Sequence, residues 1–168
     1  RSDLHAMTSA RDEVQDLYDR APCGYHSLDR EGRFARINQT ELNWLGRTRE
    51  EVIGRPLLDF LAPHSAAVFH ETFARFLKEG EIKDIEVDLV RSTGSLMPVL
   101  VSATALRNAD GELMMSRSTV FDNTEQKMME AQLDRLARTD PLTSLSNRRD
   151  FRERAEQEDN RHQCNVYK

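Results

Sequence analysis

The sequence predicts an α+β fold in which a five-stranded antiparallel sheet carries short helices on one face, flanked by N- and C-terminal amphipathic helices. Three observations lead to this prediction. Two strand-like runs joined by a turn stand early in the chain. Two helix-cap signals and a longer amphipathic segment follow them. The second half then changes to the two-residue period of strands, in three runs separated by turns.

The N-terminal segment, residues 1–19, contains no Gly or Pro and places Met7, Val14 and Leu17 at helical spacing between charged residues. This pattern predicts one amphipathic helix with a narrow apolar stripe. Two interpretations of the stripe remain open: packing against its own domain, or the seam of a two-helix dimer.

Strands are expected in both halves of the domain. Residues 25–28 and 33–37 flank the turn Asp-Arg-Glu-Gly and predict a hairpin. Alternating apolar and polar residues, separated by Gly-containing turns, predict a three-strand meander at residues 82–91, 96–106 and 113–121.

Helices are expected between the hairpin and the meander. Asn38 stands three residues before Glu41, and Thr48 three residues before Glu51, which predicts two consecutive short helices with side-chain caps. A longer helix is expected over residues 65–79, because its apolar residues share one face and a glycine follows it.

The segment at residues 124–138 predicts an exit helix. Thr124 is the expected N-cap, and Met129, Leu133 and Leu136 follow at coiled-coil spacing.

Composition restricts the class of protein. The 168 residues suit about one domain with flanking helices. Hydrophobic content of 38%, charged content of 32% and a mean hydropathy of -0.68 describe a soluble protein with one modest core. A net charge of -5 and a pI near 5.6 argue against nucleic-acid binding, which requires a dense basic patch.

The cysteines and apolar runs indicate a cytoplasmic chain. Cys23 and Cys164 are far apart, without a C-x-x-C pair, and suggest neither a disulfide framework nor a zinc site. The longest apolar stretch, residues 96–106, is interrupted by Pro98 and is too short to span a bilayer, so we expect no membrane contact and no signal peptide. Because the chain begins with Arg1, we expect an excised piece of a longer protein.

The segment INQTELNWLGRTREEVIGR at residues 37–55 contains an Asn, a Leu-Gly pair and a Thr-x-Glu-Glu-apolar-apolar-Gly motif. It resembles the middle of the PAS family, whose order of elements also matches the one expected here. Asp122 and Thr124 resemble the D-x-T junction from which the family's exit helix departs. The resemblance implies a sensory PAS domain at residues 20–123, followed by a signalling helix at 124–138.

The segment TDPLTSLSNRRDF at residues 139–151 resembles the D-x-L-T-G-L-x-N-R-R-x-F start of the GGDEF domain, the catalytic unit of bacterial diguanylate cyclases, although Ser144 replaces the usual Gly. The resemblance implies that residues 139–168 are the truncated start of this domain, with Pro141 bounding the exit helix. No Gly follows Gly111, so the nucleotide-binding loop is absent. We expect no enzymatic activity in this chain and a parent protein that makes cyclic di-GMP.

PAS relatives often hold a small molecule between the sheet and the helices, so large apolar residues are pocket candidates, although ordinary core packing explains them equally well. The candidates, with one histidine, are Phe34, Trp44, Phe60, Phe69, His70, Phe73, Val101 and Met115.

No cofactor is assigned from the sequence, but haem is an alternative. Haem-binding PAS relatives place an axial His on the long helix, where His70 stands next to Phe69; the competing interpretation is a partly exposed helical His. His26 is interpreted as a strand residue. A flavin photosensor is not expected, because no cysteine lies on the short central helices.

The resemblance implies a mechanism in which a ligand, redox state or partner changes the packing of the core. Asp122 and Thr124 would carry the change into a paired helix formed by Met129, Leu133 and Leu136, and so control the downstream cyclase domains of a homodimer. Three alternatives remain: a ligand-free dimerisation module, a haem-based gas or redox sensor, and a sensor that feeds a histidine kinase.

Overall fold

The computed structural model describes residues 2–138, with side chains from residue 6 onward. The chain divides into two units between Thr124 and Glu125. The predicted start of a diguanylate cyclase domain at residues 139–168, with Pro141 and Ser144, lies outside the described residues.

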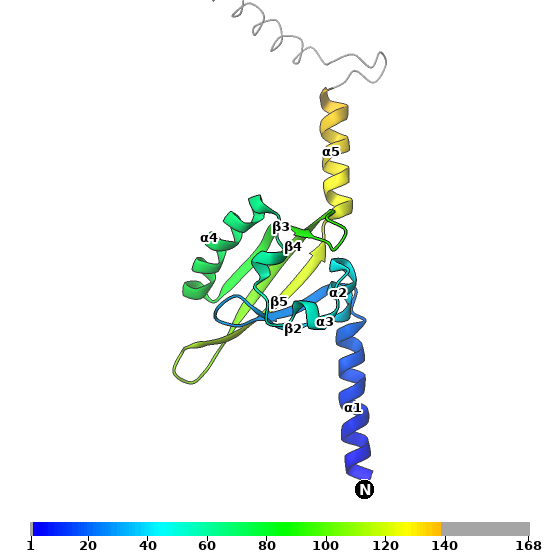
Figure 1. Ribbon diagram of the computed structural model, residues 1–168, viewed down its shortest axis with the longest axis vertical. Coiled ribbons are helices and arrows are strands. Elements are labelled where there is room, and N and C mark those ends of the chain that lie inside the picture. The colour runs from blue at the N-terminus through cyan, green and yellow to red at the C-terminus, as the bar shows by residue number, and fades with distance from the viewer. Residues whose placement is uncertain (1, 139–168) are drawn as a thin grey trace, which may run out of the picture. The chain divides into compact units, whose positions relative to one another are not determined.

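Five strands form one antiparallel sheet in the order β2-β1-β5-β4-β3 (Figure 1). The chain enters through the first hairpin, crosses by way of the helices to the far edge, and returns through the meander, so that β5 comes to lie beside β1. The predicted five-stranded antiparallel sheet is therefore confirmed. The strands are β1 (Gly24–Leu28), β2 (Phe34–Ile37), β3 (Glu81–Val90), β4 (Leu96–Arg107) and β5 (Leu113–Asp122).

The helices between β2 and β3 begin where their cap signals stand. The Asn38 side chain accepts a hydrogen bond from the Glu41 backbone N–H, and Thr48 forms a reciprocal capping box with Glu51, so both predicted caps are confirmed. The long helix begins at Pro63, earlier than expected, because proline suits a first helical position. The elements are α2 (Gln39–Leu45), α3 (Arg49–Val52), the 3-10 helix η1 (Leu57–Phe60), which the sequence did not predict, and α4 (Pro63–Glu79).

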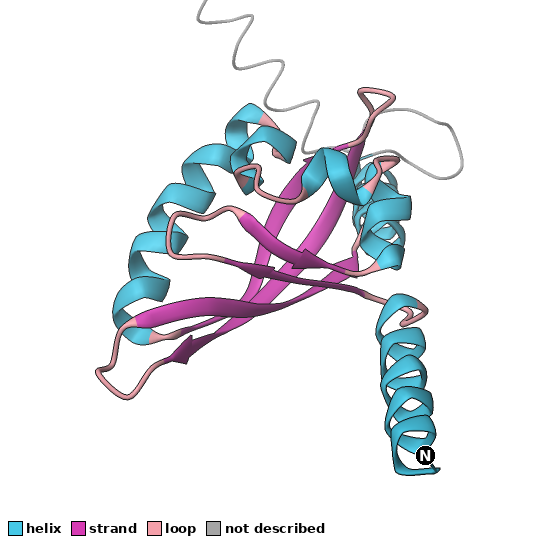
Figure 2. Cartoon of the chain, turned by 60° about the horizontal axis from the view of Figure 1, so that its bottom comes forward, coloured by secondary structure: helices cyan, strands magenta, loops and turns pink. Residues whose placement is uncertain are grey.

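One face of the sheet carries the core. Leu42, Val52 and Phe60 from the short helices pack with Val99 and Val120 from the sheet into one buried cluster. Figure 2 shows the strands as a continuous sheet with α4 along one side. Because side chains alternate along a strand, only every second strand residue reaches this face.

The N-terminal helix α1 (Ser2–Asp19) contacts the domain through its last turn. The Tyr18 hydroxyl donates to the Tyr25 carbonyl at 3.2 Å, and the two rings stack with centroids 5.8 Å apart. Met7, Val14 and Leu17 are 73%, 66% and 69% exposed, so within the described residues this stripe does not pack against its own domain. The dimer interpretation of the stripe stays a prediction.

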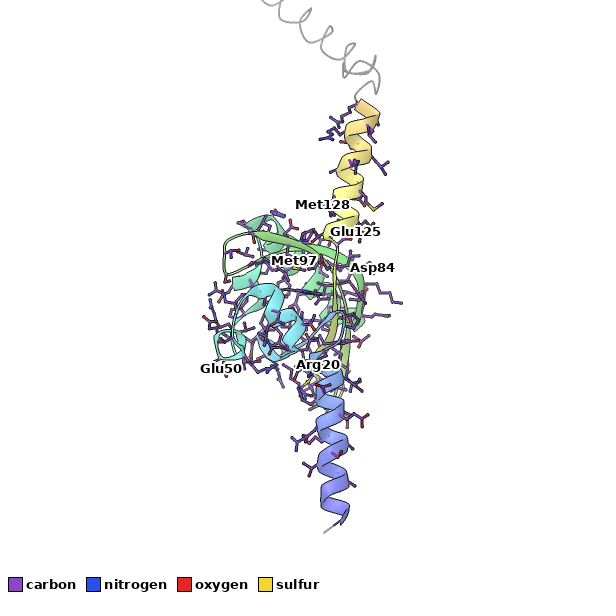
Figure 3. All side chains as sticks on the ribbon, turned by 90° about the vertical axis from the view of Figure 1, so that its right-hand side faces the viewer. Arg20, Glu50, Asp84, Met97, Glu125 and Met128 are labelled. Carbon is purple, nitrogen blue, oxygen red and sulfur yellow. The ribbon has the colours of Figure 1, made fainter. Side chains whose placement is uncertain are left out.

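Helix α5 (Thr124–Arg138) starts directly after β5. The Asp122 carboxylate accepts from the Thr124 backbone N–H at 2.9 Å and from its hydroxyl at 2.6 Å. Thr124 is therefore the first helical residue and not the predicted N-cap, and the Asp122 carboxylate binds its backbone N–H and its hydroxyl. Four large apolar side chains of α5, of which Met128 is labelled in Figure 3, are more than half exposed: Met128, Met129, Leu133 and Leu136.

No helix within residues 2–138 combines the length and the apolar character that a membrane crossing requires.

Candidate ligand cavity

A cavity of about 50 Å³ lies between α4 and the inner face of the sheet. Residues of β1, β3, β4 and β5 form the sheet side, and one face of α4 forms the other side. The cavity exists because the sheet presents small side chains here: Ala103 on β4, and Ser116 and Ser118 on β5. Larger strand residues at these positions would fill the space under the helix.

Aromatic rings line the helix side of the cavity. Phe69, Phe73 and Phe76 stand at successive turns of α4, and neighbouring rings stack with centroids 5.3 Å and 6.2 Å apart. The spacing of four and three residues places them on one helix face. They give the cavity an apolar wall.

A β-bulge shapes the edge strand beside the cavity. Ile82 and Ile85 would face opposite sides of a regular strand, yet both line the cavity. The register shifts between them, at Asp84, whose φ is 50° and whose backbone N–H donates to the Ser102 hydroxyl at 3.0 Å. The extra residue turns both isoleucines inward. Figure 3 labels Asp84.

A buried polar pair stands at the β1 side of the cavity. His26 Nδ1 lies 2.9 Å and 3.0 Å from the two carboxylate oxygens of Glu41, and the residues are 3% and 0% exposed. Gly24 makes room for the carboxylate, since a Cβ there would lie 3.1 Å from Glu41 Cβ and Oε2. Glu41 also lies in the first turn of α2, where the helix dipole favours a negative charge.

The second ring nitrogen of the pair is unsatisfied. His26 Nε2 is buried and has no hydrogen-bond partner in the described part of the chain, and His26 lines the cavity. Ser116 and Ser118 line it too, with their hydroxyl oxygens 3.2 Å apart, and the Leu28 backbone N–H donates to Ser116 Oγ at 2.9 Å. The cavity therefore has a polar end, and apart from Thr72 on α4 its other lining residues are apolar.

The structure brings three of the eight predicted pocket residues to this cavity: Phe69, Phe73 and Val101. The other five are not among its lining residues: Phe34, Trp44, Phe60, His70 and Met115.

The five lie elsewhere for identifiable reasons. Phe34 and Phe60 meet edge to face, with centroids 5.7 Å apart, in the core under the short helices, and Trp44 packs partly buried against the same core. Met115 alternates with the inward-facing Ser116 and thus belongs to the other face of β5. His70 is exposed on α4.

These positions bear on haem as a cofactor. A drug-sized ligand takes a pocket of roughly 300–1,000 Å³, whereas the cavity beside α4 has about 50 Å³. His70 is exposed and does not line it. The residues therefore do not fit a haem held by His70. Within residues 2–138, no group of three or more His, Cys, Asp or Glu side chains is placed to hold a metal ion.

Sequence reasoning missed the polar end of the cavity. His26 was interpreted as an ordinary strand residue, and Ser116 and Ser118 were not singled out. The available signal was the alternation of β5, which puts both serines on the same face as Val120 and so among buried residues.

Shifted pKa values occur in residues that do not line the cavity. Burial raises the pKa of Tyr18 above its ordinary value. The backbone N–H of Thr48 lowers the pKa of the Glu51 carboxyl, because the hydrogen bond favours the charged form.

Five antiparallel strands, helices over one face and a cavity beneath the longest of those helices define an α+β domain with an internal cavity. Residues 22–125 match the PAS domain family, and the chain belongs to that family. PAS domains are sensory modules typical of signal-transduction proteins.

The chain is also similar to a much longer curated protein. An uncharacterized protein from Azorhizobium caulinodans is 34% identical over 125 residues, which cover 71% of this chain and 17% of that protein. The chain thus spans less than a fifth of the length of this curated relative.

Solved structures support the fold. The PAS domain of an HTR-like protein from Haloarcula marismortui is 22% identical with a TM-score of 0.62, over 72% of this chain and 98% of that one. A domain of a sensory box sensor histidine kinase/response regulator from Geobacter sulfurreducens is 19% identical with a TM-score of 0.56, over 69% and 96%.

Proposed function

We propose that this PAS domain senses a small molecule or a partner and controls, through a paired helix, a downstream diguanylate cyclase domain. The observation that carries the proposal is the exposed apolar stripe of α5, which begins directly after the last strand of the sensory domain. The GGDEF-like motif at residues 139–151 supports the identity of the output. On this proposal the chain is cytoplasmic, where GTP is available, and has no catalytic activity of its own.

The strand β5 links the cavity to the start of α5. Ser116 and Ser118 line the cavity, and the same strand ends at Asp122. Two hydrogen bonds from Thr124 to the Asp122 carboxylate fix the first helical residue to the strand end. A ligand that shifts β5 would thereby reorient the first turn of α5.

The partner of α5 is a second copy of this chain. Met129, Leu133 and Leu136 are 59%, 65% and 54% exposed and follow the spacing of a coiled-coil seam. Pairing would bury this stripe in a homodimer and bring two cyclase domains together. Such a seam has discrete registers, and a coupling of about 1–3 kcal/mol is enough to shift their balance.

A second candidate function is a ligand-free dimerisation module. The small volume of the cavity, about 50 Å³, favours it. It predicts the same dimer but no bound small molecule.

Light scattering on the purified chain tests the dimer. The wild type should have the mass of a dimer, and Leu133→Lys should have the mass of a monomer, because a charge in the seam cannot be buried unpaired. Ala131→Lys is the matched control, since this exposed residue lies on the opposite side of α5 from the seam. A wild-type monomer, or a dimer that survives Leu133→Lys, contradicts the proposal.

Mass spectrometry and an absorption spectrum of the same sample separate the candidate functions. A defined small molecule released on denaturation supports sensing, whereas an empty dimer favours the dimerisation module. A Soret band that disappears in His70→Ala would establish haem instead.

A further inference from the structure

We propose that His26, Ser116 and Ser118 form the polar end of a binding site for a small, uncharged, amphipathic molecule that carries a hydroxyl group. This inference rests on the proposed sensory function and names the class of ligand. Two independent observations support it: a cavity beside α4, and an unpartnered polar atom of a buried side chain that lines it.

The Glu41 carboxylate holds the imidazole of His26 in place. Both carboxylate oxygens lie within 3.0 Å of Nδ1, so this nitrogen carries a proton and donates it to Glu41. Only Nε2 is left for another partner, and no polar group of the described residues supplies one. A buried polar atom without a partner destabilises the folded protein, so a ligand that pairs with Nε2 removes this cost on binding.

A hydroxyl group suits Nε2 in either charge state of the ring. In a neutral imidazole whose Nδ1 carries the proton, Nε2 is an acceptor and takes the hydroxyl proton. In an imidazolium, Nε2 carries a proton and donates it to the hydroxyl oxygen. A carbonyl or an ether meets only the second case.

The serines offer a second hydrogen bond to the same hydroxyl group. His26 and Ser118 are directly opposite partners in the β1–β5 ladder, so their side chains leave the sheet side by side. Ser116 Oγ accepts from the Leu28 backbone N–H and lies 3.2 Å from Ser118 Oγ. One serine donates to the other, which leaves one hydroxyl proton of the pair without an acceptor in the described part of the chain.

The rest of the lining sets the charge and size of the ligand. Among the described residues, no Lys or Arg lines the cavity, so a carboxylate or phosphate ligand would be buried near Glu41 without a counter-charge. Apart from Thr72, the remaining lining residues are apolar, and three of them are phenylalanines from α4. About 50 Å³ is several times the roughly 10–15 Å³ that a cavity needs to hold one water. A short alkanol therefore fits after a small displacement of the α4 rings.

The test is an NMR titration of the full chain with two series of probes, the straight alkanols from ethanol to 1-hexanol and the corresponding 1-chloroalkanes. The two series have similar shapes, but only the alkanols have a hydroxyl group. We expect saturable shifts of β1 and β5 amides at millimolar alkanol, with at least about tenfold weaker binding of the chloroalkane of the same length, because the hydroxyl makes two hydrogen bonds.

Three variants assign the binding to the polar end. In His26→Asn, the shorter amide still donates to Glu41 but has no atom at the Nε2 position, and we expect about tenfold weaker alkanol binding. Ser118→Ala removes one hydroxyl with little change of shape and should weaken binding by about three- to tenfold. His70→Asn is the matched control on the exposed face of α4 and should bind as the wild type does.

The proposal is overturned if chloroalkanes bind as tightly as alkanols, or if alkanol binding is unchanged in both His26→Asn and Ser118→Ala. It is also overturned if the alkanols cause no saturable shifts at all, which is the result expected when only water pairs with Nε2. None of these results decides the proposed function, because the dimer mass and the control of a cyclase are measured separately. A chain that fails to dimerise but binds alkanols selectively would leave this inference intact.

Discussion

Replacing Asn38 by alanine should destabilise the domain strongly, because this one side chain joins three segments. Asn38 is fully buried and uses all four of its hydrogen-bonding positions. Its Oδ1 accepts from the backbone N–H groups of Tyr25 at 2.9 Å and Glu41 at 3.2 Å. Its Nδ2 donates to the carbonyls of Tyr18 at 2.8 Å and Cys23 at 3.0 Å. The end of α1, the start of β1 and the start of α2 therefore meet at this residue.

The magnitude follows from the groups that the substitution leaves unpaired. Loss of the α2 cap at the Glu41 N–H costs about 1 kcal/mol. The Cys23 carbonyl is buried, and leaving it without a donor costs about 1–3 kcal/mol. The two half-buried partners can recover part of their loss from water. We expect Asn38→Ala to lower the free energy of unfolding by about 3 kcal/mol.

Urea unfolding followed by fluorescence measures this change. Trp44 is the single tryptophan and packs partly buried against the core, so its emission reports unfolding of the domain. Asn43→Ala is the matched control on the same helix, since Asn43 is exposed and its side chain accepts a hydrogen bond from the exposed Gln39 side chain. It should change the free energy of unfolding by less than about 0.5 kcal/mol. Equal effects of Asn38→Ala and Asn43→Ala would refute the reasoning.

Two further predictions concern stability. Gly24→Ala should lower the free energy of unfolding by about 1–3 kcal/mol, because the new Cβ would lie 3.1 Å from both Glu41 and Val120; a melting temperature equal to that of the wild type would contradict this. The pKa of the Glu51 carboxyl is lowered in the folded state, so its charged form stabilises the domain. This contribution to the free energy of unfolding is present above the ordinary carboxyl pKa, and it is lost as the pH falls through the lower folded-state value. Glu51→Gln keeps the hydrogen bond to Thr48 but has no titrating group. The free energy of unfolding of this variant, measured with urea, should fall less steeply at acid pH than that of the wild type; an equally steep fall would show that other carboxyls cause it.

Local patterns carried most of the fold prediction. The caps at Asn38 and Thr48 depend on a side chain and the next three residues, so the sequence shows them directly. The strands of the meander follow from their two-residue period. The helix η1 was missed because it is a single turn between Pro56 and Leu61, too short for a periodic pattern.

The cavity could be predicted only in part, because it depends on contacts between distant segments. The residues on α4 share a helix face, so Phe69 and Phe73 were identifiable as neighbours. The polar end requires β1 to pair with β5, which sets His26 opposite Ser118, almost the length of the domain away in sequence. The sequence contains no local signal for that pairing. The distinction between cavity and filled core also depends on side-chain volumes across the layer, and the periodicity of one strand does not reveal these.

The most direct test of the central claim is the rate of cyclic di-GMP synthesis in the proposed longer protein, with residues inserted into α5 between Ala131 and Gln132. A seven-residue helical insertion preserves the heptad phase of the seam, whereas a four-residue insertion shifts it. If the sensory domain controls the output through paired helices, the heptad insertion should keep regulated synthesis and the four-residue insertion should fix the rate at an unregulated level. Equal rates for the two insertions, or no cyclic di-GMP from the uninterrupted protein, would contradict the account.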